Sequence, residues 1–118
     1  MTAPRDHTLD VLLDLDGQVL VVDPAGGHWV RFVVTRVAVS PEKPHGLDYS
    51  LTLHGPDGGR LVGFDNAHPV ERQKRGGPQD HRHRLRGIRP YEYRDAATLL
   101  ADFWKTVDAV LRERGVIP

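Results

Sequence analysis

The sequence predicts an α+β fold in which a mostly antiparallel sheet of four to six strands is packed by a long C-terminal helix. Two patterns lead to this prediction. The first two thirds of the chain hold short stretches with apolar side chains at alternate positions, separated by turn residues, as is typical of strands. The last quarter repeats apolar side chains at helical spacing. With 118 residues, the chain fits a single domain, residues 1–118.

The expected strands form a meander over about residues 8–65: 9–15, 19–22, 28–39, 47–54 and 60–65. The first ends at the turn dipeptide Asp16-Gly17. The third carries valines on both alternating sets, which predicts cover on both faces for part of its length. Residues 47–54 show the clearest period of two. The turn Gly55-Pro56-Asp57-Gly58-Gly59 is too short for a parallel crossover, so the strands on either side should pair antiparallel.

The helix is expected over about residues 95–114. Its apolar stripe consists of Leu99, Leu100, Phe103, Trp104, Val107, Val110 and Leu111. Asp95 is a good N-cap, and Gly115 fits the first position beyond the helix. We expect the stripe to cover one sheet face. If the stripe is wider than a small sheet covers, it would also pair two protomers into a homodimer.

The composition excludes several classes of protein. The chain has no Cys, so disulfide scaffolds, thiolate zinc sites and cysteine nucleophiles are ruled out. No apolar run approaches the roughly 18 residues of a membrane span, and the polar N-terminus lacks the apolar core of a signal peptide. The expectation is a soluble, cytoplasmic protein with no membrane partner.

The charges are unevenly distributed along the chain, although the formal net charge is zero. Residues 1–59 hold four basic and eight acidic side chains, a net of −4. Residues 60–94 hold nine basic and four acidic side chains, a net of +5. A neutral protein with one basic segment can present a local anion site.

The His/Arg-rich segment, about residues 66–94, is where chemistry is expected. Residues 68–90 show no apolar periodicity, so a long irregular stretch is expected there, and such stretches are often functional or disordered. Its densest part is Asp80-His81-Arg82-His83-Arg84. Histidines at i and i+2 point to the same side of an extended chain. The two arginines would then lie on the other face or splay outwards.

Three chemistries fit these residues, and an exposed, solvated loop fits them as well. His81 and His83 could cleave RNA without metal, as general base and general acid, with an arginine on the phosphate. Alternatively, His81, His83 and His68 with Asp65 or Asp80 could hold Zn²⁺ or Mn²⁺. Thirdly, the basic segment could bind a phosphate or an acidic partner without reaction.

Structural roles are expected for other conspicuous side chains. Core positions are expected for Trp29, Phe103 and Trp104, and Tyr91 or Tyr93 is expected to pack beside the start of the helix. Asn66 fits a residue that ends a strand through bonds from its side chain to the main chain. No role is assigned to His7, His28 or His54.

At these residues the sequence resembles the TumE family of toxins from bacterial and archaeal toxin–antitoxin pairs. The resemblance covers roughly residues 47–114. It is carried by Tyr49-Ser50-Leu51, Gly63-Phe64-Asp65-Asn66-Ala67-His68 and Asp80-His81-Arg82-His83. Members tend to show Tyr-Asp-Asn-Ala-Pro-His at a strand end, a His-His-Lys-His cluster and a C-terminal helix.

The match to the family motifs is incomplete. Asp65, Asn66 and His68 match the first motif, and His81 and His83 match the last histidines of the second. Phe64 stands in place of the usual Tyr, and no Pro precedes His68. Asp80 replaces the first clustered His, which puts a three-histidine metal site in doubt.

The resemblance implies a growth-inhibiting toxin that is neutralised by an adjacently encoded antitoxin with a DNA-binding helix-turn-helix. A small ribonuclease is the usual activity of such toxins, so RNA is the expected target. The catalytic residues would be His81 and His83, with Asp65 orienting an imidazole or holding a metal and His68 a weaker participant.

Phosphate binding would fall to Arg82 and Arg84. No cofactor is required by this scheme, although a divalent metal stays open. The alternative is a non-catalytic interaction module that binds an acidic partner or target through its basic segment.

Overall fold

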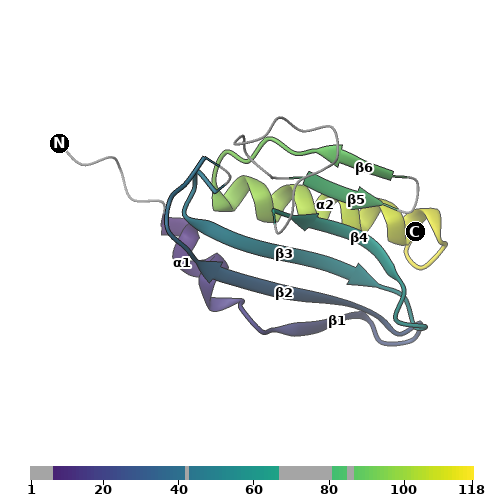
Figure 1. Ribbon diagram of the computed structural model, residues 1–118. Helices are drawn as coiled ribbons and strands as arrows, with labels where there is room; N and C mark the ends of the chain where they lie inside the picture. Colours follow the sequence, from purple (N-terminus) through teal and green to yellow (C-terminus); the bar gives the residue numbers. More distant parts are fainter. Residues whose placement is uncertain (1–6, 42, 67–80, 85–86) are drawn as a thin grey trace.

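The chain forms one antiparallel sheet with helices against it (Figure 1). The computed structural model describes residues 7–41, 43–66, 81–84 and 87–118, with 81–84 and 87–90 described by their main chain. The elements are α1 (His7–Asp14), β1 (Val19–Asp23), β2 (His28–Arg36), β3 (Leu47–His54), β4 (Arg60–Asp65), β5 (His81–Arg84), β6 (Gly87–Pro90) and α2 (Ala96–Glu113). Strand order follows chain order, β1-β2-β3-β4-β5-β6. The predicted α+β fold is confirmed.

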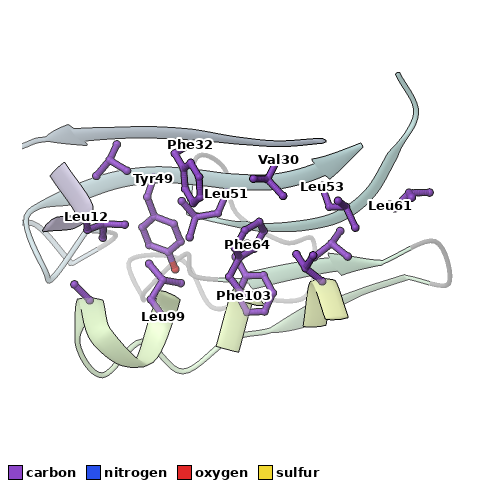
Figure 2. Packing of buried hydrophobic residues seen from close by; sticks show 14 of the residues in the cluster. Leu12, Val30, Phe32, Tyr49, Leu51, Leu53, Leu61, Phe64, Leu99 and Phe103 are labelled. Carbon is purple, nitrogen blue, oxygen red and sulfur yellow. The ribbon is translucent and has the colours of Figure 1, made fainter. Parts of the chain in front are cut away.

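The core lies between α2 and one face of the sheet (Figure 2). Strand β3 shows why: alternate residues Leu47, Tyr49, Leu51 and Leu53 are all buried. The register places Leu51 beside both Phe32 and Phe64. Phe103 of α2 meets these two rings edge-on, at centroid distances of 5.8 and 6.0 Å. The apolar stripe predicted for the C-terminal helix is therefore the helical half of the core.

Residues 9–15 were predicted to be a strand, and that prediction is wrong, because His7–Asp14 forms helix α1. A strand would place Val11 on the same face as Leu9 and Leu13. Instead, Val11 is 54% exposed and Leu12 is fully buried. Leu9, Leu12 and Leu13 follow the i, i+3, i+4 spacing of a helix, whose apolar side packs against α2 and β2. The turn at Asp16-Gly17 is confirmed, with Gly17 at a φ of 80°.

Two further predictions from the sequence differ from the structure. Strand β2 ends at Arg36 and has only one buried face, since Val30, Phe32 and Val34 are buried whereas Val33 is 36% exposed. The irregular stretch predicted over residues 68–90 is wrong for 81–84 and 87–90. These residues form strands β5 and β6, in which β5 pairs with β4 and β6 pairs with β5. Main-chain pairing therefore forms strands here although the side chains show no periodicity.

Helix α2 has the caps that the sequence predicts. The Asp95 carboxylate accepts a hydrogen bond from the Thr98 N–H at 2.7 Å. At the other end, the Gly115 N–H donates to Arg112 and the Val116 N–H to Leu111. Gly115 has a φ of 74°, so this is a Schellman motif that requires a left-handed residue.

Candidate functional site

The candidate site lies on the sheet face opposite the helices. Residues that are directly paired in an antiparallel ladder occupy the same face. One row of paired positions runs Arg31, Thr52, Gly63 and His83 from β2 to β5. The adjacent row runs Val33, Ser50, Asp65 and His81. The strands therefore bring two predicted catalytic histidines to positions beside Asp65.

Asp65 ends β4 at the centre of this arrangement. Its neighbour Phe64 packs against Phe103 in the core, so the alternation of the strand directs Asp65 to the opposite face. Asp65 is 3% exposed, and its register partners are Ser50 and His81. A buried carboxylate at such a position interacts more strongly with a neighbouring charge or donor than it would in water.

Gly63 leaves a gap in the other row. It lies between Thr52 and His83 in the register and brings no side chain of its own. The Thr52 side chain is held by His54, whose Nε2 lies 2.9 Å from the Thr52 Oγ1. Gly63 is itself buried and places no side chain between Thr52 and the position of a predicted catalytic histidine.

Trp29 lies on this same face rather than in the core, which corrects the role expected for it. Its ring stacks on His54 with centroids 4.1 Å apart and planes 10° apart. His54 Nδ1 lies 3.0 Å from the Gly58 carbonyl oxygen. A carbonyl only accepts, so Nδ1 is the donor, and Nε2 of the neutral ring accepts from the Thr52 hydroxyl. His54 thus has a structural role that the sequence did not reveal.

Arg31 adds a cation to this face. It is exposed, and within the described part of the chain it makes no ion pair or hydrogen bond. Arg36 lies on the same strand, five residues further on, and the alternation places it on the face that the helices cover. The two arginines therefore carry the same charge and lie on the same strand, but on opposite faces of the sheet. Alternation along the strand separates the two arginines, but only the pairing of β2 to β5 places Arg31 in the row of His83, which is why sequence reasoning missed it.

Asn66 follows Asp65 and has a structural role, as predicted. It is fully buried. Its Oδ1 accepts from the Tyr49 N–H at 2.9 Å, and its Nδ2 donates to the Leu47 carbonyl at 2.8 Å. The side chain thereby continues the pairing of β3 where β4 ends. This anchoring fixes the preceding residue, Asp65, in place.

The remaining predicted site residues separate into two groups. Arg82 and Arg84 pair in register with Phe64 and Val62, which are core residues. Their positions therefore fall on the face that the helices cover, opposite the positions of His81 and His83. His68 and Asp80 lie outside the described residues.

Tyr91 packs as predicted. Its ring meets Phe64 at 5.0 Å, and its hydroxyl donates to Asp102 of α2 at 2.6 Å. Among the described side chains, no three His, Asp or Glu residues gather as metal ligands would. No described helix is long and apolar enough to cross a membrane.

A buried histidine, His28, to which the sequence analysis assigned no role, joins three elements away from this face. His28 Nδ1 lies 2.9 Å from Asp23 Oδ2, and the Arg114 Nε–H donates to His28 Nε2 at 3.2 Å. Because Nε2 accepts, Nδ1 is the donor to Asp23. This bond from His28, with a further one from the Gly26 N–H, lowers the pKa of Asp23 below its ordinary value. Both ring nitrogens are occupied, so the cluster connects β1, β2 and the end of α2.

The comparisons with known proteins bear on the family of the chain. A family model described as toxin TumE matches residues 18–111. That range includes β1 to β6 and most of α2. No curated protein and no solved structure matches the chain.

Proposed function

Because the chain belongs to the TumE toxin family, and therefore to toxins that have a cognate antitoxin, we propose that it acts on RNA as a small ribonuclease through the sheet face opposite its helices. The observation that carries the proposal is the register of β4 and β5, which pairs His81 with the buried Asp65 and His83 with Gly63. Two titratable imidazoles beside an oriented carboxylate are the groups that metal-free cleavage of RNA requires.

In this reaction each of the two imidazoles transfers one proton. One imidazole takes the proton from a 2′-hydroxyl, and the 2′-oxygen attacks the adjacent phosphorus. The bond from phosphorus to the 5′-oxygen breaks, and the other imidazole, protonated, gives its proton to that oxygen. His81 and His83 are two residues apart on one strand, a spacing of about 7 Å that suits a phosphate between them. Asp65 is the positioning residue for His81.

Charge on the phosphate requires cations close to it. Arg31 is exposed and lies in the same row as His83 but three strands away, about 14 Å at the usual strand spacing. It therefore suits contact with a neighbouring phosphate of the RNA backbone. Arg82 and Arg84 remain the proposed phosphate-binding residues on β5 itself. Because they pair in register with the core residues Phe64 and Val62, their positions fall on the helix-covered face. They would therefore contact neighbouring phosphates where the RNA passes round the end of β5, and not the phosphate between His81 and His83. His68 is kept as a weaker participant.

The test is cleavage of labelled RNA by the purified chain, beside His81→Ala/His83→Ala and with or without EDTA. We expect the wild type to cleave and the double variant to lose at least about a hundredfold of the rate, because general acid and base each contribute that much or more. Cleavage that EDTA abolishes would replace the acid–base scheme with a metal site. Unchanged cleavage by a folded double variant would contradict the catalytic assignment.

Asp65→Asn serves as the matched variant for positioning. It keeps the size of the side chain but removes the charge that stabilises an imidazolium, so the pH profile of cleavage should shift to lower pH along with a slower rate. Absence of cleavage by the wild type under every condition would favour the alternative, a non-catalytic module that binds an acidic partner through residues 60–94, where the net charge is +5.

A further inference from the structure

Trp29 carries a large aromatic ring on the sheet face opposite the helices, so this ring adds nothing to the core. The side chain is half-buried, and one face of the indole stacks on His54 of β3 with centroids 4.1 Å apart. On the other side, its register partner in β1 is Val21, which is 61% exposed. A valine side chain is much shorter than an indole, so the outer part of the second ring face is left open.

His54 is held rigidly behind this ring. Its Nδ1 donates to the Gly58 carbonyl at 3.0 Å, and its Nε2 accepts from the Thr52 hydroxyl at 2.9 Å. Both bonds lie in the plane of the imidazole, so they fix the plane against which the indole of Trp29 stacks. A ring that is already ordered loses little conformational entropy when another flat group stacks on it.

A cation lies next to the ring. Arg31 is two residues further along β2 on the same face, about 7 Å from Trp29 at the usual rise of a strand. Arg31 is exposed, and within the described residues it makes no ion pair or hydrogen bond. Two carboxylates at this end of the sheet are already engaged, since Asp23 binds His28 and Asp57 accepts from a main-chain N–H of its own turn. An open aromatic ring beside an exposed guanidinium suits a nucleotide, whose base stacks and whose phosphate carries the negative charge.

We propose that Trp29, backed by His54, is a stacking platform for one base of single-stranded RNA, with a neighbouring phosphate on Arg31. A duplex does not fit, because its bases are stacked on one another. Trp29 lies three strands and one row from the position of His83, about 16 Å at the usual spacings, so the base belongs to a nucleotide away from the cleaved bond. The inference rests on the proposed action on RNA and names its substrate as single-stranded.

The first test is the fluorescence of Trp29. The chain holds two tryptophans, so Trp104→Phe leaves Trp29 as the reporter. A single-stranded 2′-O-methyl oligonucleotide lacks the free 2′-hydroxyl that cleavage uses and serves as the probe. We expect this probe to quench the Trp29 emission, because a base stacks directly on the indole. An abasic oligomer with the same number of phosphates should leave the emission unchanged. Equal quenching by the two oligomers, or none by either, would overturn the platform.

The second test compares two replacements of the same side chain. Trp29→Phe keeps a ring on which a base can stack, whereas Trp29→Leu keeps only an apolar side chain. We expect Trp29→Leu to weaken binding of the probe at least about fivefold, since stacking of one base contributes that much or more. Trp29→Phe should stay within about threefold of the unmodified chain. Equal affinities of the two variants would overturn the assignment.

The outcomes separate this inference from the ribonuclease proposal. Quenching of Trp29 without cleavage of unmodified RNA would contradict the ribonuclease and leave the platform as an RNA-binding site. Cleavage without quenching would overturn the platform alone. Quenching by the cognate antitoxin but not by the oligonucleotide would assign the ring to a protein partner and would overturn the platform as well.

Discussion

At the scale of single residues, Asn66 shows how a motif residue can serve folding rather than chemistry. Its amide satisfies one donor and one acceptor of β3, and it is fully buried. A buried main-chain group that loses its partner costs about 1–3 kcal/mol. The side chain therefore supports Asp65 by fixing the end of β4.

Replacing Asn66 tests this role. Asn66→Leu leaves the Tyr49 N–H and the Leu47 carbonyl without partners and should lower the free energy of unfolding by about 2–4 kcal/mol. Ser50→Ala, a half-buried change on the same strand, is the control and should stay within about 1 kcal/mol. Chemical denaturation measures both. A variant that loses activity while keeping its free energy of unfolding would show that Asn66 acts on the substrate instead.

The residues around Asn66 also show what a sequence can reveal about a site. Asp65 was predictable as a candidate because it ends a strand beside the His/Arg-rich segment. The role of His54 was not, because its contacts to Trp29 and Gly58 depend on the β2–β3 register and on the turn after β3. Local pattern identifies the reactive residue types, whereas pairing decides which of them meet.

At the scale of elements, Asp23, His28 and Arg114 connect two strands to the end of α2. Since Asp23 has a lowered pKa when folded, the unfolded chain binds more protons between the folded value and the ordinary value of 3.8. The contribution of Asp23 to stability is therefore present above the ordinary value. It is lost as pH falls through the lower folded value.

Thermal unfolding as a function of pH measures this contribution. We expect Asp23→Asn to lower the Tm by a few degrees at pH 6, and we expect that difference to shrink towards zero as the pH falls through the folded pKa. The Thr98 main-chain bond also lowers the pKa of Asp95, so Asp95→Asn is a parallel case in which the Tm difference should likewise shrink as the pH falls. A Tm difference that is constant from pH 6 downwards would contradict the role of the Asp23 charge.

The helices and strands differ in how well the sequence predicted them. Strand β3 was predictable because one face is buried and the other is polar, and α2 because a long stripe and both caps agree. Helix α1 was not, since eight residues with two aspartates fit either period. Its burial against α2 and β2 decided the outcome. Strands β5 and β6 were hidden because charged side chains carry no periodicity.

At the scale of the whole molecule, the sheet separates two charged regions. The strand order places β1, whose one charged residue is Asp23, at one edge and the basic strands β5 and β6 at the other. With strands about 4.8 Å apart, β1 and β5 lie roughly 19 Å from each other.

The same face should determine how RNA binding depends on salt. Each phosphate contact on a single strand contributes about 0.7 to the slope of log affinity against log salt. Arg31→Ala should reduce that slope by about 0.7 and weaken binding, because Arg31 is exposed on the proposed RNA face. Arg36→Ala removes an equal charge from the same strand on the other face and should leave the slope unchanged. Titration of fluorescent single-stranded RNA at several salt concentrations measures both slopes, and equal slopes would show that RNA does not cross this face of the sheet.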